Sequence, residues 1–186
     1  MKRTLALLVL ALATVTAASA QQNVNFADLP LVSTPTLLPN GYGSLNWSNI
    51  FYVDPSQWSG AGLGYKDGPI GGILRPQDVA FIGSKACRQL QEACYGTISA
   101  LGAGGIQPIS FQPVSAVVAA GYGPTYMTVI AYKNGNYVGS LSFPLGTQLR
   151  TINFPASWTS VTQLVFQTDA GGDLVFYDLQ FYLLGG

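Results

Sequence analysis

The stretch YMTVIAYKNGNYVGSLSFPL, Tyr126–Leu145, decides the fold. At its centre is Asn134-Gly135, the pair that most strongly favours a tight type I′ turn between two antiparallel strands. Apolar or small residues alternate with polar ones after the turn, and one face is predicted to carry Tyr137, Gly139, Leu141, Phe143 and Leu145. Before the turn, Tyr126–Tyr132 is apolar on both faces, which is typical of an inner strand between two layers.

The rest of the chain is predicted to form short strands separated by turns, because 22 glycines and 11 prolines are spread along the sequence. Near the C-terminus, alternation predicts one apolar face made of Val175, Tyr177, Leu179, Phe181 and Leu183. Other strands are predicted at Val24–Phe26, Ile50–Val53, Val79–Ile82, Gly96–Ala100, Gln107–Phe111 and Val161–Thr168. Only Ser84–Ala93, around the cysteines, has a helical pattern. These patterns predict an all-β antiparallel sandwich, jelly-roll or galactose-binding-like, with at most one short helix.

The first twenty residues have the organisation of a secretory signal peptide. Lys2 and Arg3 precede the apolar run Leu5–Ala13, and Ala18-Ser19-Ala20 offers small residues at the cleavage positions. The apolar run is too short for a bilayer-spanning helix. We therefore expect residues 1–20 to be removed and residues 21–186 to form one secreted, extracellular domain, a monomer with no membrane association after cleavage.

Composition excludes several classes of function. Charged residues make up only 9% of the chain, against a typical share of about 25%. Loss of Lys2 and Arg3 leaves six basic residues against eight acidic ones, a net charge of −2. No basic patch is available to neutralise phosphates, so nucleic acid is not an expected partner. The absence of histidine excludes catalytic triads that use it and every histidine-bearing metal site.

The chain has two cysteines, Cys87 and Cys94. In an oxidising compartment, such a pair is predicted to form a disulfide that closes a short loop. The spacing is not Cys-x-x-Cys, and no further ligands lie nearby, which disfavours a redox or metal-binding pair.

Four segments together resemble a group of small secreted β-sandwich proteins that is frequent in filamentous fungi. The matching segments are Asn25–Pro30 (NFADLP), Leu38–Asn49 (LPNGYGSLNWSN), Tyr132–Gly135 (YKNG) and Phe176–Leu179 (FYDL). The second is the specific one, because the group carries a Gly-Tyr-Gly-Gly-Leu-Asn-Trp segment there. This chain departs from the group at Ala27 and Ser44, where the group often has an acid and a glycine. The resemblance implies a jelly-roll fold similar to that of carbohydrate-binding modules, and it implies no defined activity.

Two acids near the ends of the mature chain, Asp28 and Asp178, form a candidate calcium site. First and last strands are commonly neighbours in jelly rolls, and acids near both termini often hold a structural Ca²⁺ in carbohydrate-binding modules of this shape. Calcium takes six to eight oxygens, so Asn25 or Gln180 would have to assist. The alternative is that Asp28 caps a turn and Asp178 lies on a polar strand face. Calcium is thus a possible structural cofactor, and no other cofactor is expected.

Aromatic side chains beside polar ones suggest a sugar-binding surface. The candidate ligand residues are Tyr42, Asn46, Trp47, Tyr65 and Tyr122. The competing interpretation places Trp47 in the core, since tryptophan is highly buried on average. Asn46 also belongs to the chain's one Asn-x-Ser/Thr sequon and is a candidate glycosylation site, which a buried Trp47 would disfavour.

Catalysis is not expected. Glycoside hydrolysis needs two carboxylates across a cleft, and the sequence places no such pair on one strand face. The function best indicated is a secreted, non-catalytic protein that binds cell-wall or surface carbohydrate. The alternatives are an effector or structural protein that binds a host or cell-surface protein, and an atypical hydrolase that uses two aspartates.

Overall fold

The computed structural model describes residues 20–60, 62, 78–83, 93–101 and 108–184. Within these residues the chain forms strands and a single turn of 3₁₀ helix, Tyr42–Ser44, and no helix there is long and apolar enough to cross a membrane. The expected signal segment lies outside the described residues apart from Ala20, and so does the expected helix near the cysteines, except that Ala93 begins a strand.

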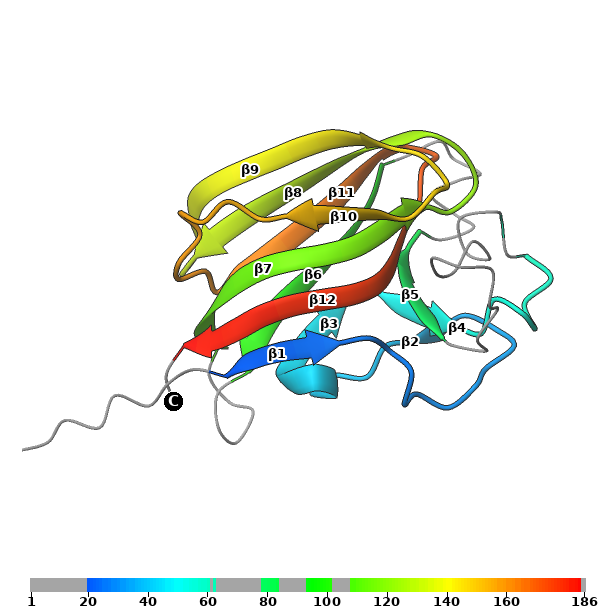
Figure 1. The fold of residues 1–186 in the computed structure, drawn as a ribbon, viewed down its shortest axis with the longest axis horizontal. Coiled ribbons are helices and arrows are strands. Elements are labelled where there is room, and N and C mark those ends of the chain that lie inside the picture. The colour runs from blue at the N-terminus through cyan, green and yellow to red at the C-terminus, as the bar shows by residue number, and fades with distance from the viewer. Residues whose placement is uncertain (1–19, 61, 63–77, 84–92, 102–107, 185–186) are drawn as a thin grey trace, which may run out of the picture.

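Two antiparallel sheets stack face to face (Figure 1). Sheet A follows the order β2-β4-β5-β12-β7-β10, with β1 paired to the C-terminal half of β12. Sheet B follows the order β3-β6-β11-β8-β9. The strands of sheet A are β1 (Gln21–Val24), β2 (Thr36–Leu37), β4 (Phe51–Val53), β5 (Val79–Ile82), β7 (Pro108–Ala120), β10 (Arg150–Asn153) and β12 (Leu174–Leu184). The strands of sheet B are β3 (Leu45–Ser48), β6 (Ala93–Leu101), β8 (Thr125–Lys133), β9 (Asn136–Leu145) and β11 (Gln163–Ala170). The predicted all-β antiparallel sandwich is confirmed.

The core lies between the sheets and is rich in phenylalanine. Phe166 of β11 and Phe176 of β12 are fully buried, and their rings meet edge to face at 5.0 Å between centroids, which joins sheet B to sheet A. Phe154 touches Phe166 from the loop after β10, and Trp158 stacks on Phe154. Edge-to-face rings add about 0.5–1.5 kcal/mol beyond the area they bury. This chain of rings fixes how the two sheets stack.

The strand after the hairpin contains a β-bulge, and the prediction that Tyr137 shares a face with Leu141 and Phe143 is wrong for this reason. Ala131 pairs with Gly139, but the next pair is Tyr132 with Tyr137, so Val138 is an extra residue on β9. One inserted residue reverses the side on which the preceding side chains point. Tyr137 therefore lies on the outer face of sheet B, whereas Leu141 and Phe143 pack inward as expected.

The last strand also contains a β-bulge, so its predicted apolar face is wrong before the bulge. Phe176 pairs with Val118 and Asp178 with Val117, which leaves Tyr177 as the extra residue. The core face of β12 is consequently Leu174, Phe176, Leu179 and Phe181. Alternation alone assigned Val175 and Tyr177 to that face and Phe176 to the opposite one.

The outer face of sheet A is covered beside β4 and β5. Val175 packs there with Val53, Val79 and Phe81 in a separate small cluster, and Trp58 stacks on Phe81 with ring centroids 5.7 Å apart. This cover buries apolar side chains that point away from the main core. The outer face of sheet B differs, because it carries exposed tyrosines.

Substitution of Phe166 by alanine should destabilise the fold by about 3–5 kcal/mol, because it removes the ring that joins the two sheets and leaves a cavity. Gln167, the next residue of β11, is exposed, and its substitution by alanine should change stability by no more than about 0.5 kcal/mol. Urea unfolding followed by tryptophan fluorescence measures both. Equal losses in the two variants would contradict the assigned role of Phe166.

Candidate functional site

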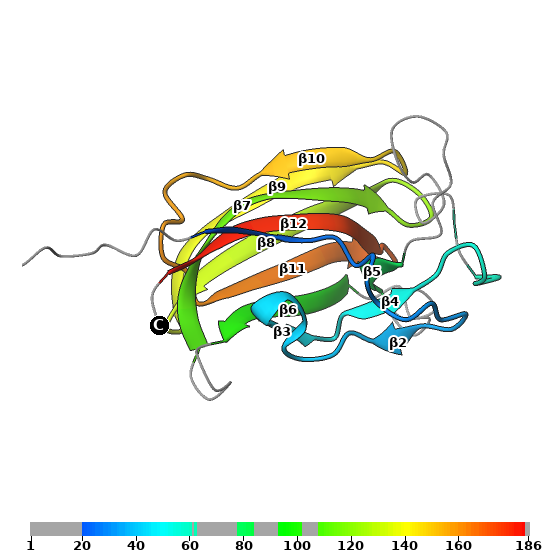
Figure 2. The ribbon, with the colours of Figure 1, turned by 60° about the horizontal axis from the view of Figure 1, so that its bottom comes forward.

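The outer faces of all five strands of sheet B form one continuous polar and aromatic surface, which we call the tyrosine face. Figure 2 shows β8, β11, β6 and β3 of sheet B side by side. Its members alternate along each strand with core residues. They are Asn46, Ser48, Tyr95, Thr97, Ser99, Tyr126, Thr128, Ile130, Tyr132, Tyr137, Ser140, Ser142, Gln163, Val165 and Gln167.

Strand register arranges these side chains in cross-strand rows. One row runs over five strands and consists of Asn46, Ser99, Gln163, Tyr132 and Tyr137. At its end the Tyr132 and Tyr137 rings pack edge to face at 6.4 Å, and the Tyr137 hydroxyl lies 3.0 Å from Ser140 Oγ.

Two further rows run parallel to the first. One consists of Ser48, Thr97, Val165, Ile130 and Ser140, and the other of Tyr95, Gln167, Thr128 and Ser142. In the latter row, Thr128 Oγ1 and Ser142 Oγ are 2.8 Å apart. The rows bring together residues from five separate segments of the chain.

Three of the four tyrosines of this face are exposed, and Tyr132 is half-buried. The exposed fraction is 59% for Tyr95, 51% for Tyr126 and 63% for Tyr137. The prediction that Tyr126–Tyr132 is buried on both sides is therefore wrong, because only alternate residues such as Met127 and Val129 face the core. In the sequence, both faces of β8 are apolar. Because only one of these faces can pack on the core, this pattern was the available signal that the other is an exposed aromatic surface.

None of the members of the tyrosine face carries a charge, and the acidic side chain of Asp169 on β11 lies at the edge of the face beside Tyr126. The polar groups of the members are the amides of Asn46, Gln163 and Gln167 and several hydroxyls, which both donate and accept hydrogen bonds. Flat aromatic rings beside such groups suit ligands that have apolar ring faces and many hydroxyls. The surface can therefore hold a neutral, polyhydroxylated molecule.

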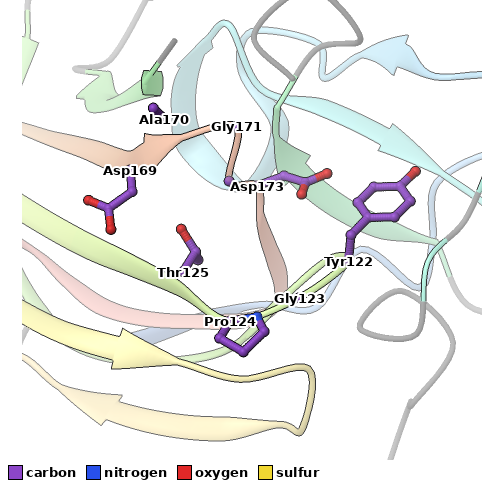
Figure 3. Close-up of a pocket in the computed structure, with 9 residues that line it drawn as sticks. Tyr122, Gly123, Pro124, Thr125, Asp169, Ala170, Gly171 and Asp173 are labelled. Atoms are coloured by element: carbon purple, nitrogen blue, oxygen red, sulfur yellow. The ribbon is translucent and has the colours of Figure 1, made fainter. Parts of the chain in front are cut away.

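A pocket of about 280 Å³ lies at one end of this face (Figure 3). The turn between β7 and β8 and the turn between β11 and β12 form it, with lining residues Tyr122, Gly123, Pro124, Thr125, Asp169, Ala170, Gly171, Gly172 and Asp173. We call it the end pocket. Asp169 Oδ2 accepts a hydrogen bond of 3.2 Å from the Tyr126 backbone N–H, so the pocket adjoins the tyrosine face.

Two of the ligand residues predicted around the Gly-Tyr-Gly segment, Trp47 and Tyr42, make contacts within the fold. Trp47 is only 4% exposed, its Nε1 donates to the Tyr42 carbonyl at 2.9 Å, and its ring meets Phe26 at 5.9 Å. The core interpretation of Trp47 is thus the correct one. Tyr42 stacks on Phe26 and donates from its hydroxyl to Asp28 Oδ1 at 2.5 Å. Burial and this hydrogen bond raise the pKa of Tyr42 above its usual range.

The other predicted site residues are distributed between the two surfaces. Asn46 belongs to the tyrosine face and Tyr122 to the wall of the end pocket. Tyr65 and Cys87 lie outside the described residues. The Cys87–Cys94 bridge and glycosylation of Asn46 therefore stay predictions, as does any ligand contact of Tyr65.

The two acids of the predicted calcium site have different partners. Asp28 accepts from the Tyr42 hydroxyl, whereas Asp178 Oδ2 accepts from Gln180 Nε2 at 3.5 Å. The proposed helpers are also engaged, because Asn25 Oδ1 accepts from the Ala27 N–H at 3.2 Å. Within the part of the chain that the structure describes, no three acidic or cysteine side chains cluster as a metal site. Calcium at Asp28 and Asp178 stays a prediction.

Two other carboxylates are close enough to influence each other, but both are buried. Asp54 and Asp78 are each 1% exposed. Although burial opposes ionisation of Asp54, hydrogen bonds from Ser56 and Gln57 lower the pKa of its carboxyl. Burial raises the pKa of Asp78 to about 6, and the Asp54 charge adds to this effect. A polysaccharide has no access to this pair, so it does not support hydrolysis.

The described residues form an antiparallel β-sandwich in which the outer face of sheet B carries exposed tyrosines beside amides and hydroxyls. No family model and no curated protein matches the chain. Solved structures that are similar include TmCBM61 in complex with β-1,4-galactotriose, at 14% identity and a TM-score of 0.35, covering 76% of this chain and 88% of that chain. Another is the family 32 CBM from C. perfringens NanJ in complex with galactose, at 11% identity and a TM-score of 0.37, covering 87% of this chain and 99% of that chain.

A further similar structure is the enzymatically active domain of tailspike protein 4 from Bacteriophage CBA120, at 11% identity and a TM-score of 0.38. The match covers 76% of this chain but only 19% of the tailspike chain. At these identities the similarities concern the sandwich fold and not the ligand.

The pKa of Asp78 predicts how stability depends on pH. A carboxyl whose pKa is raised by folding binds its proton more tightly in the folded state, so its contribution to stability is present at low pH. That contribution is lost as pH rises from about 4, the unfolded pKa, through about 6, the folded value. Asp78→Asn should therefore flatten the fall in the free energy of unfolding between pH 4 and 7.

Burial also raises the pKa of Asp178, so some fall should remain in Asp78→Asn and disappear in the double variant with Asp178→Asn. Urea unfolding at several pH values measures these slopes. An unchanged slope in both variants would contradict the burial of these carboxyls.

Proposed function

We propose that the protein is an extracellular, non-catalytic carbohydrate-binding protein that holds a neutral polysaccharide across the tyrosine face. The observation that carries the proposal is an uncharged surface of tyrosines, amides and hydroxyls that spans five strands. Tyr95, Tyr126 and Tyr137 are exposed and belong to neither hydrophobic core cluster. Ring stacking together with hydrogen bonds from neutral side chains is the usual chemistry of glycan recognition.

The charge of this surface favours neutral ligands. A sulfated, phosphorylated or uronic acid polymer would lose the hydration of its anions without gaining a cation, since the members of the tyrosine face include neither lysine nor arginine. Cellulose, chitin, β-glucan and xylan are neutral and present apolar ring faces. We therefore expect the ligand to belong to this class of neutral polysaccharides.

The dimensions favour a polymer over a single sugar. Tyr95 and Tyr137 stand on strands three positions apart in sheet B, which corresponds to about 14 Å across the strands. They also lie in rows two apart, or about 13 Å along the strands. One sugar ring cannot contact both tyrosines, so simultaneous stacking requires a chain of several residues.

Export, cleavage after Ala20 and a single monomeric domain over residues 21–186 belong to the same proposal, since wall polysaccharides lie outside the cell. The alternatives are a cell-surface or host protein as the ligand of this face, and hydrolysis of the bound glycan. A pull-down of residues 21–186 on insoluble cellulose, chitin, β-glucan and xylan, with and without a calcium chelator, distinguishes them. Retention without release of soluble sugar supports binding. Absence from every pellet would overturn the proposal and leave a protein ligand.

Retention on the polymer should depend on the exposed tyrosines. Each of Tyr95→Ala and Tyr137→Ala should weaken binding about two- to twelvefold, the equivalent of about 0.5–1.5 kcal/mol for one aromatic contact. Leu37→Ala is the control, because Leu37 is 60% exposed but lies on β2 of sheet A. Depletion isotherms on the retained polymer measure the three variants. An effect of Leu37→Ala as large as those of the tyrosines would contradict the placement of the site.

A further inference from the structure

We propose that the end pocket binds a single terminal residue of a neutral glycan, a ring with free adjacent hydroxyl groups. This inference rests on the proposed function and adds a second subsite to it. The tyrosine face is broad and takes the interior of a chain, whereas the end pocket is a hollow between two turns and takes a chain end.

The size of the pocket fits one ring. Its volume of about 280 Å³ is close to the lower limit of small-molecule sites, about 300 Å³. Three glycines keep this space open, Gly123 on one turn and Gly171 and Gly172 on the other. A Cβ on Gly172 would collide with Thr125 Oγ1, and Gly171 has a φ of +74°, so side chains are disfavoured at both positions.

The polar groups of the pocket suit hydroxyls. Asp173 is only 3% exposed, yet it lines the pocket together with the exposed Asp169. Carboxyl oxygens accept hydrogen bonds, so these two side chains suit adjacent hydroxyls of a sugar. Among the described residues that line the pocket there is no lysine or arginine, so none of them offers a cation to a sialic or uronic acid.

The pocket also has an aromatic wall. Tyr122 is 39% exposed, and its hydroxyl donates to the Gly60 carbonyl, which holds the ring at the rim. Figure 3 shows Tyr122 on the same side as Asp173, with Thr125 and Asp169 on the other side of the turn. A ring between them would have an apolar neighbour on one side and acceptors around its edge.

The position of the pocket gives the direction of the chain. Asp169 is hydrogen-bonded to the backbone of Tyr126, the first tyrosine of the face on β8. A glycan whose terminal ring occupies the pocket would therefore continue over Tyr126 and along the tyrosine face. Chain ends and chain interiors are thus bound by adjoining surfaces with separable residues.

The test is NMR titration of ¹⁵N-labelled residues 21–186, in the presence of a calcium chelator, with glucose, galactose, xylose, N-acetylglucosamine and their β-linked oligosaccharides. Gly123→Leu places a large side chain at the lining of the pocket, and a Cβ at Gly123 meets no atom within 4 Å, so the fold accommodates it. Gly146→Leu is the matched control, since a Cβ there also meets nothing within 4 Å and Gly146 is not a lining residue. Asp169→Asn removes one charge at nearly constant shape.

We expect one sugar series to shift the amide signals of Thr125, Gly171 and Gly172. Gly123→Leu should weaken that binding at least tenfold, Asp169→Asn should weaken it too, and Gly146→Leu should leave it unchanged. Retention of Gly123→Leu on insoluble polymer should persist through the tyrosine face. Tyr95→Ala should weaken retention on insoluble polymer and leave sugar binding in the end pocket unchanged.

The outcomes separate the two proposals. Sugar-induced shifts confined to face residues such as Thr97 and Val165, or pocket binding that Gly123→Leu leaves intact, would overturn the end pocket and leave the polysaccharide face standing. The absence of any shift, together with no retention on polymer, would overturn both.

Discussion

The contact between Phe166 and Phe176 is the interaction on which the rest of the structure depends. It joins β11 to β12, the strands near the middle of their sheets, and so sets which side of each sheet faces the core. Once those sides are buried, the alternate side chains must point outward. On sheet A, Trp58 and its neighbours cover part of that outer side. On sheet B the outward residues include exposed tyrosines, and the candidate site is formed there.

Charge is distributed so that this outer face stays neutral. Asp54 and Asp78 lie buried away from solvent, and Asp169 stands at the boundary between the tyrosine face and the end pocket. A neutral surface suits long polymers of neutral sugars, while acceptors concentrated in a small pocket suit one ring with free hydroxyls. Under the proposed function, the same sandwich offers two kinds of contact to one class of ligand.

Much of the fold could be predicted from local sequence. The Asn134-Gly135 turn and the alternation around it predicted β8 and β9, and most other strands followed from short apolar runs between turns. Bulges at Val138 and Tyr177 were not predictable, because an inserted residue leaves the composition unchanged while it reverses the facing of its neighbours. The short strands β2, β3 and β10 were missed because their pairing depends on partners elsewhere in the chain, in β4, β6 and β7.

The sequence by itself determined an all-β chain of low charge, with aromatic residues beside amides and hydroxyls, because turn chemistry and alternation are local properties. The tertiary structure alone decided which aromatics meet solvent. Trp47, in the most distinctive segment, became a core residue, while Tyr95, Tyr126 and Tyr137 became a surface. The physical reason is that exposure depends on sheet stacking and register, which bring five separate segments together across long stretches of chain.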